Sequence, residues 1–510
     1  MTSPPTRPGD DPVDGAWRDL GQRGTHAALQ LAVRSVILRG LTFIGTITLA
    51  RLLAPADFGV YGIVAAVVSI WTALGDFGLG ASLVQQAEPP TAAQLKTVWT
   101  IQQLIALAAV IVIWLGAPLL NGLIAGLPDG APWMLRVLAL GLLMSSLRTL
   151  PAVMMERELR FGPLAAAEVV QQATFYAVAI VLAVLHAGPW AFVLAGLAQL
   201  AVGALIVNLA WRHWPRVGID RTGLRAMFGF GFAYQGSIVV LTIRDAPLPA
   251  LAGLAAGTVA AGLIQFAVRL ALTISTIDDL VARIAFPAFS RLQSHPDQQA
   301  RALNLAILMT GLVLVPAQCA IAALAPVLVP IVFGGQWSDA VPPLQMICRA
   351  TLLRFPARYL RQAEFAAGAT RRGLGMSIVT TVLALTGFEA GLLGWGLPGS
   401  GAGFLIGAAL GLWASIRLAA DMPGLSWSRL WLLIGSGLAA AAGALAALYG
   451  GGRMLGLSIP PAGAVVASVV LVAAASAVFG AICLALIVVT NRSTLETGWR
   501  LARRATGLQS

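Results

Sequence analysis

Five arginines lie deep inside long apolar segments, where bulk water does not reach them. Their positions are Arg39, Arg148, Arg269, Arg349 and Arg354. A charged side chain at the centre of a membrane-spanning helix costs about 2.5 to 3.5 kcal/mol on insertion scales. Arginine keeps its proton in proteins, so titration does not relieve that cost. The sequence therefore predicts a buried polar cavity lined by guanidinium groups, and an anion is the ligand that such a cavity binds.

Acidic residues at a comparable depth are few. Asp279 can pair with Arg283 four residues later, and Asp245 neighbours Arg244 near the opposite end of the preceding segment. Asp76 stands alone near the end of its segment. These five residues are candidates for coupling or gating. These acidic residues are too few to balance the deep arginines, so a net positive charge remains near the middle of the membrane. That net charge predicts an anionic substrate.

A structural role is the alternative for each deep arginine, which can donate to backbone carbonyls or pack its stem between helices. A second set of arginines lies nearer the ends of the apolar segments, which favours anchoring at the membrane interface. That set consists of Arg34, Arg51, Arg136, Arg244 and Arg283.

The elements that position these charges are expected to be membrane-spanning helices. Hydrophobic residues make up 58% of the 510 positions and charged residues 11%, with a mean hydropathy of +0.83. The apolar runs are about 20 residues long, which is typical of transmembrane helices. We predict an all-α polytopic membrane protein with about fourteen helices around a central polar cavity. After an opening pair within 31–86, the segments are expected at 98–125, 132–155, 164–186, 189–211, 226–250, 256–289, 302–333, 341–366, 373–394, 398–417, 430–450 and 462–490.

A weak internal repeat indicates two similar halves. Leu147-Arg-Thr-Leu-Pro151 and Leu353-Arg-Phe-Pro356 each place an arginine shortly before a proline, about six spans apart. We therefore predict two pseudo-symmetric bundles of about six helices. The expected boundaries are a disordered tail (1–29), an N-terminal bundle (30–211), a basic linker (212–225), a C-terminal bundle (226–417), two further helices (430–490) and a basic tail (491–510).

Most of the 33 basic residues lie in alternate loops, which is a topology signal rather than a sign of nucleic-acid binding. Loops rich in arginine and lysine usually lie on the cytoplasmic side, and this positive-inside rule predicts that both termini are cytoplasmic. Loops are too short for a soluble catalytic domain, and the sequence has no phosphate-binding G-x-x-x-x-G-K-[ST] motif. We therefore expect no cofactor and no enzymatic activity. The three cysteines are isolated, which indicates neither a disulfide nor a metal site. The basic loop positions include Lys96, Arg157, Arg216, Arg361 and Arg372.

Five short segments resemble bacterial oligosaccharide flippases of the multidrug/oligosaccharidyl-lipid/polysaccharide exporter superfamily. They are LARLLAPADFGVYG (49–62), GDFGLGASLVQ (75–85), MERELRF (155–161), AFPAFSRLQ (285–293) and FGGQW (333–337). The third segment resembles the subgroup that serves exopolysaccharide or colanic-acid-like units. The Arg-Asp pair typical of the lipid II branch is not evident after Arg39.

The resemblance implies a multi-pass protein of the bacterial inner membrane that works by alternating access. Its substrate would be an undecaprenyl-diphosphate-linked oligosaccharide repeat unit, moved for exopolysaccharide or O-antigen synthesis. The implied partners are that glycan lipid, the bilayer and polysaccharide polymerase or export proteins, with no nucleic acid. The deep arginines would bind the diphosphate.

Three other functions compete with this one. A multidrug exporter of the same superfamily would favour cationic drugs and buried acids. A membrane enzyme of glycan assembly would need a large outer loop or a carboxylate cluster. A lipid scaffold would depend on the arginines for partner binding rather than for flux. The sequence leaves the coupling ion open.

Overall fold

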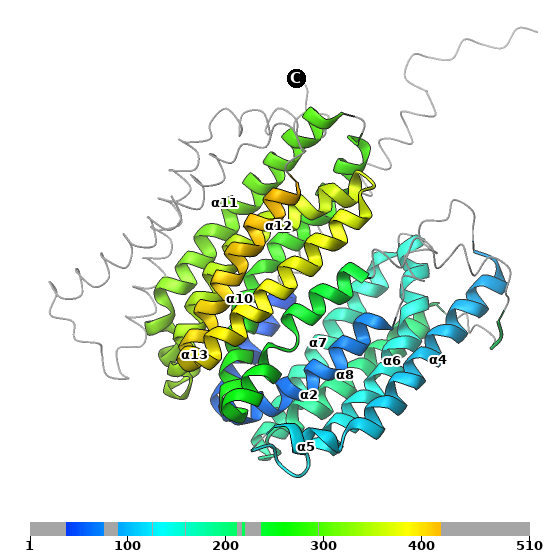
Figure 1. The fold of residues 1–510 in the computed structure, drawn as a ribbon. Coiled ribbons are helices and arrows are strands. Elements are labelled where there is room, and N and C mark those ends of the chain that lie inside the picture. The colour runs from blue at the N-terminus through cyan, green and yellow to red at the C-terminus, as the bar shows by residue number, and fades with distance from the viewer. Residues whose placement is uncertain are drawn as a thin grey trace, which may run out of the picture.

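The computed structural model describes residues 37–75, 90–124, 126–158, 160–211, 217–219, 236–293 and 295–419 (Figure 1). These residues form helices and turns, with no strand among them. Asp76 lies outside the described residues, as do the predicted tails and the predicted helices within 430–490. The predicted total of about fourteen helices and the division into two halves remain predictions.

The first group of helices, drawn from blue to teal in Figure 1, consists of α2 and α4 to α8. Local signals account for where these helices begin. At α4, the Thr91 hydroxyl accepts from the Gln94 backbone N–H at 3.3 Å, and the Gln94 side chain accepts from Thr91 N–H at 2.9 Å. The bounds are α2 (Pro55–Leu74), α4 (Ala92–Gly116), α5 (Leu119–Leu123), α6 (Ala131–Arg157), α7 (Phe161–Val184) and α8 (Trp190–Trp211).

The helix over residues 37–52 precedes α2 and contacts α7. Its Thr46 hydroxyl lies 3.2 Å from the Tyr176 hydroxyl.

The second group, drawn from green to orange in Figure 1, consists of α10 to α13 and the short helix over residues 236–245. Two of its long helices are interrupted by glycines with positive φ, namely Gly257 (φ 82°) in α10 and Gly396 (φ 66°) in α13. Each break lets the chain turn back on itself, because glycine adopts positive φ without steric cost. The bounds are α10 (Leu248–Arg291), α11 (Pro296–Leu328), a π-helical turn (Val329–Phe333), a 3-10 turn (Gly335–Ala340), α12 (Val341–Ala366) and α13 (Thr370–Leu418).

Eight helices among the described residues are long and apolar enough to cross a membrane. On α4, for example, Leu107, Ile111 and Leu115 form an exposed apolar stripe with a four-residue spacing, as a lipid-facing helix does. The protein is therefore a multi-pass membrane protein. The eight segments are Pro55–Leu74, Ala92–Gly116, Ala131–Arg157, Gly162–Val184, Trp190–Trp211, Gly236–Thr273, Asp297–Phe333 and Thr370–Leu418.

The arginine-rich helix α12 is not among these eight, although its bounds are those expected from the sequence. Neighbouring helices shield its charges from lipid, because α12 packs against α10, α11 and α13 and most of its residues are buried. Arginine can be kept inside a membrane protein where it faces the protein interior rather than lipid.

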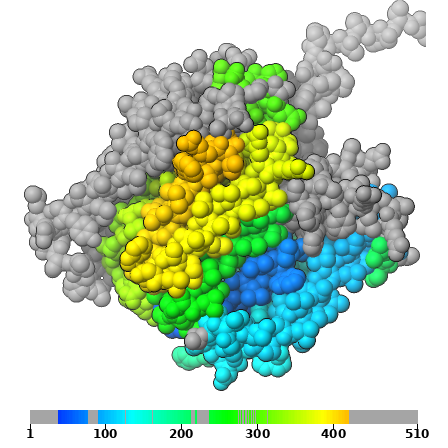
Figure 2. Space-filling model, in the orientation of Figure 1, coloured from blue at the N-terminus to red at the C-terminus, as the bar shows by residue number. Residues whose placement is uncertain are grey.

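The two groups meet where α2 packs on α10, with their backbones in contact. A Cβ atom on Gly59 would overlap the backbone oxygen of Thr258, and one on Gly262 would overlap that of Pro55. Figure 2 shows the blue segment, residues 37–75, lying between the cyan helices of the first group and the green surface of the second. Small residues permit this approach, as they do in many membrane helix pairs.

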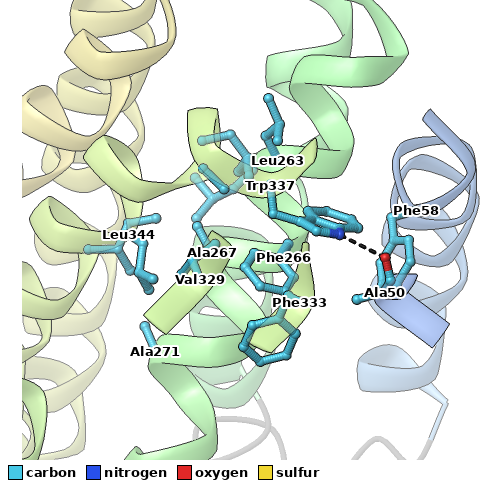
Figure 3. Close-up of a cluster of buried hydrophobic side chains, with 14 of the residues drawn as sticks. Ala50, Phe58, Leu263, Phe266, Ala267, Ala271, Val329, Phe333, Trp337 and Leu344 are labelled. Carbon is cyan, nitrogen blue, oxygen red and sulfur yellow. Dashed lines mark hydrogen bonds between the residues drawn. The ribbon is translucent and has the colours of Figure 1, made fainter. Parts of the chain in front are cut away.

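Beside this contact, three side chains donate to backbone carbonyls across the two groups. The Trp337 indole N–H and the Gln336 amide donate to Ala50 O at 2.9 and 2.6 Å, and Figure 3 shows the bond from Trp337. Arg51 donates to the carbonyls of Ile331 and Val332 at 2.6 and 2.8 Å. We call this set of contacts by Arg51, Gln336 and Trp337 the seal.

The seal satisfies carbonyls that helix geometry leaves without partners. Ala50 lies in the last turn of its helix, where carbonyl groups have no intrahelical donor. Aromatic packing adds to the contact, since the Trp337 ring stacks on Phe266 at 4.5 Å and meets the edge of Phe58 at 4.8 Å. The sequence predicts Arg51 as an interfacial anchor, and in the structure its exposed side chain also joins the two groups.

We expect Trp337→Phe to destabilise the protein, because the donor to Ala50 O is lost and the smaller phenyl ring fills the buried site less completely. The lost hydrogen bond contributes about 1 kcal/mol, which corresponds to a fall in Tm of about 1 °C in a chain of this length, and the unfilled space adds to that fall. Thermal unfolding of the purified protein measures this. Trp413→Phe is the matched control, since Trp413 is 57% exposed on α13. Equal Tm values for the two variants would contradict a stabilising role for the indole N–H.

Candidate functional site

Two polar cavities lie next to each other within the helices. The first, which we call the central pocket, has a volume of about 680 Å³ and is formed mainly by α2, α7, α8 and α10. The second, which we call the arginine pocket, has a volume of about 540 Å³ and is formed by residues 236–245, α10, α12 and α13. Both volumes are in the range of small-molecule binding sites. Asp245 and Leu272 line both pockets, so the two adjoin at these residues.

Asp245 binds two arginines at the boundary between the pockets. Its carboxylate accepts from Arg244 at 2.8 and 3.0 Å, and each of its oxygens accepts from Arg354 at 2.9 Å. The local chain explains this position. Asp245 ends its helix because Pro247 follows, and the residues before a proline are disfavoured in helical conformation. One carboxylate between two guanidinium groups leaves a net positive charge.

Helix α12 contributes three arginines to the arginine pocket. Arg354, Arg358 and Arg361 have the i, i+4, i+7 spacing that places side chains on one helix face. Arg358 forms an ion pair with Asp278 of α10 at 2.9 Å. Among the residues that the structure describes, four arginines and two aspartates line the pocket, a formal excess of two positive charges.

Arg361 is the residue that best indicates an anionic ligand. It is only 7% exposed, and it makes no hydrogen bond or ion pair with the residues that the structure describes. A buried charge is costly unless it is paired. A bound anion would supply the missing partner.

Arg269 is the one arginine on the wall of the central pocket among the described residues. It donates to the Tyr176 hydroxyl at 3.0 Å, and its guanidinium carbon lies 6.0 Å from the centre of the Phe175 ring. Since Tyr176 in turn contacts Thr46, Arg269 connects α10 to α7 and to the helix over residues 37–52. Its place is therefore fixed by the first group of helices.

The structure separates the predicted site residues into those at the pockets and those elsewhere. Arg269, Arg354, Arg244 and Asp245 line the pockets. Three other deep arginines line neither. Arg148 lies 3.9 Å from Glu168, Arg349 donates to the Met346 sulfur at 3.3 Å, and Arg39 is exposed. Asp76 and the side chains of Asp279 and Arg283 lie outside the described part of the chain.

The interpretation of Arg244 as an interfacial anchor is wrong. Its side chain is only 13% exposed and is paired with Asp245 at the wall of the arginine pocket. Hydropathy extends the seventh segment to residue 250, which puts Arg244 near its end. The helix actually stops at Asp245, and the turn at Ala246 and Pro247 directs these charges toward the middle of α12.

Sequence reasoning missed Arg358 and Arg361 as members of the site. The charge pattern assigns Arg361 to the cytoplasmic end of its segment, whereas the structure buries it. The i, i+4, i+7 spacing from Arg354 was a usable signal, because it marks one polar face on a helix that is otherwise surrounded by protein.

Comparisons with known proteins agree with a role in polysaccharide assembly. A family model described as "Polysaccharide biosynthesis protein" matches residues 48–342. The chain is 25% identical over 313 residues to the succinoglycan biosynthesis transport protein ExoT of Rhizobium meliloti (strain 1021), covering 60% of this chain and 62% of that one. It is 24% identical over 342 residues to the lipopolysaccharide biosynthesis protein WzxC of Escherichia coli (strain K12), covering 66% and 68%. The match to ExoT thus spans less than two thirds of that protein's length.

Solved structures show the same fold. The lipid II flippase MurJ in an inward closed conformation matches with a TM-score of 0.71 at 12% identity, covering 91% of this chain and 99% of that one. An inward-facing multidrug resistance transporter of the MATE family, within the MOP superfamily, matches with a TM-score of 0.62 at 16% identity, covering 80% and 98%. The chain therefore has the fold of MOP-superfamily transporters, and it belongs to the polysaccharide biosynthesis protein family.

Proposed function

We propose that this protein is a flippase that moves an undecaprenyl-diphosphate-linked oligosaccharide across the bacterial inner membrane, for exopolysaccharide or O-antigen synthesis. The observation that carries the proposal is the buried Arg361, which has no hydrogen-bond or ion-pair partner among the described residues, in a pocket whose described lining has excess positive charge. The family and the transporter fold support it. Because relatives are named as transport or biosynthesis proteins, we propose transport rather than catalysis.

The arginine pocket has the chemistry that a diphosphate needs. A diphosphate carries several negative charges, and the guanidinium fork binds phosphate oxygens with paired hydrogen bonds. Arg354 and Arg361 would bind the diphosphate, while Asp245 and Asp278 hold the neighbouring arginines in place. The polyprenyl tail would remain in the bilayer, so only the glycan and the phosphates enter the pockets.

Transport requires that the two ends of the molecule open in turn. We propose that the basic end, with Lys96, Arg157 and Arg372, is cytoplasmic, as are both termini. The seal would then close the periplasmic end. A ligand shifts such an equilibrium only by binding the two states unequally, so the substrate must bind more tightly to the state that it favours.

The positive charge of the arginine pocket argues against the main alternative, an exporter of cationic drugs. The arginine pocket would repel a cation, and both of its aspartates are already paired with arginine. An amphipathic drug with an anionic group would still fit. The experiment below separates that function from glycan transport.

Deletion of the gene is expected to trap complete lipid-linked repeat units on the cytoplasmic leaflet, because the charged head group crosses a bilayer very slowly without a carrier. Extraction of undecaprenyl-diphosphate sugars from the deletion strain and its parent, followed by mass spectrometry, measures the pool. A plasmid-borne copy of the gene is the control and restores the parental level. An unchanged pool, or a pool of incomplete units, would overturn the proposal.

A further inference from the structure

Two glutamines on the wall of the central pocket have no protein partner. Gln199 of α8 and Gln265 of α10 are half-buried and make no hydrogen bond with any residue that the structure describes. A glutamine amide offers two donors and an acceptor oxygen with two lone pairs. Leaving such a group unpaired inside a membrane protein is costly unless water or a ligand occupies the space beside it.

Other glutamines of the bundle are used differently. Gln318 donates to the carbonyl of Ala271 at 2.8 Å, and Gln345 donates to that of Ala322 at 2.8 Å. Both therefore stabilise helix packing within the second group. Gln199 and Gln265 do not join helices in this way, and their amides remain available to a ligand in the pocket.

The rest of the central pocket suits a neutral, hydroxyl-rich ligand. Hydroxyl groups of Ser69, Thr72 and Thr273 line it, together with the aromatic rings of Tyr61 and Phe175. Each of these hydroxyls donates to a carbonyl of its own helix and therefore offers acceptor lone pairs to a ligand, while the two glutamine amides offer both donors and acceptors, as sugar hydroxyls do. Aromatic rings offer flat apolar faces for the C–H surface of a sugar ring.

The charges differ between the two pockets. Of the described lining residues, one arginine and one aspartate belong to the central pocket and leave it no formal excess, whereas those of the arginine pocket have an excess of two positive charges. The two meet at Asp245. A ligand that spans both therefore has an anionic part joined directly to a neutral polyhydroxylated part.

We propose that the central pocket is a carbohydrate subsite in which Gln199 and Gln265 bind the glycan hydroxyls and determine which glycan is accepted. The arginine pocket recognises the diphosphate common to all such lipids. This assignment rests on the proposed function and adds to it a separate site for sugar specificity.

The test compares two ligands on the purified full-length protein in lipid nanodiscs. One is undecaprenyl diphosphate without sugar, and the other is the same lipid carrying the oligosaccharide of the host strain. The double variant Gln199→Leu/Gln265→Leu is expected to bind the glycan-bearing lipid about thirtyfold more weakly, the effect of losing two neutral hydrogen bonds. Its affinity for the sugar-free lipid is expected to stay at the wild-type value. The variant Arg361→Gln should weaken the binding of both lipids.

Gln298→Leu is the matched control, because Gln298 is exposed at the start of α11 and lines neither pocket. Size-exclusion profiles and Tm values verify that each variant is folded. Equal losses for both ligands in the double variant, or no loss for either, would overturn the carbohydrate subsite. A wild-type protein that binds both lipids equally would also overturn it while leaving the proposed function in place. A wild-type protein that binds neither lipid would overturn the proposed function and the subsite together.

Discussion

Replacement of Arg354 by glutamine is expected to abolish glycan export, whereas the same replacement at Arg349, on the same helix, leaves export near the wild-type level. Arg354 contacts both oxygens of Asp245 at 2.9 Å and lines the arginine pocket. Arg349 lines neither pocket and donates only to the Met346 sulfur. Removing one partner of a buried, hydrogen-bonded charge pair costs about 2 to 5 kcal/mol, so export should fall by about thirtyfold or more.

Complementation of the deletion strain measures this difference, with immunoblots of the membrane fraction to verify insertion. The double variant Asp245→Asn/Arg354→Gln separates two roles of the arginine, because it removes the charge that Arg354 neutralises. We expect the double variant to insert normally and still fail to export, since the substrate needs the guanidinium. Export restored by the double variant would mean that Arg354 only neutralises Asp245. Equal losses at Arg349 and Arg354 would contradict the site.

Gly262→Ala is expected to reduce glycan export about as strongly as Arg354→Gln does, because it disturbs the contact between α2 and α10. The added methyl group would overlap the backbone oxygen of Pro55, which cannot move without shifting α2. The two groups of helices could then no longer close beside the seal. Gly375→Ala is the matched control, because nothing lies within 4 Å of a Cβ at that position of α13. Alanine also forms helices more readily than glycine, so any loss of export in Gly262→Ala comes from the overlap and not from a weaker helix.

Cysteine labelling measures closure directly. A Ser69→Cys substitution places a thiol on the wall of the central pocket, and a membrane-impermeant maleimide is added from the periplasmic side. In the parent, the seal limits labelling; with Gly262→Ala, we expect labelling to rise severalfold and export to be lost. Unchanged labelling and export in this variant would show that the α2–α10 contact does not close the molecule.

The depth of each arginine in the membrane could be predicted from the sequence, but the direction in which its side chain points around the helix axis could not. Arg349 and Arg354 fall at similar depths of α12, so hydropathy treats them alike. Five residues correspond to about 140° of rotation around an α-helix, which places the two side chains on different faces. Only the packing of α10 and α13 against α12 decides which face borders a cavity.

Helix ends were predictable where strong local signals exist. The expected segment 341–366 coincides with α12, since Pro342 and Pro343 favour a helix start and Gly368 adopts positive φ (79°) just after its end. The break after Asp245 was not predicted, although Pro247 marks it, because the apolar run continues past it. The ion pair between Asp245 and Arg354 could not be predicted for another reason. Arg354 lies 109 residues later in the chain, and nothing in the sequence indicates that the two side chains meet.

The hydrogen-bond acceptors of the seal are main-chain oxygens, and this affects which of its residues can change as related sequences diverge. Arg51, Gln336 and Trp337 donate only to main-chain oxygens. Every residue type supplies a main-chain oxygen, so Ala50, Ile331 and Val332 can change identity without losing these bonds. Selection on the seal therefore acts on the donor side alone, and paired substitutions between the two sides are not needed to maintain it. Covariation between aligned sequences would consequently under-represent this interface, even though it joins the two groups of helices.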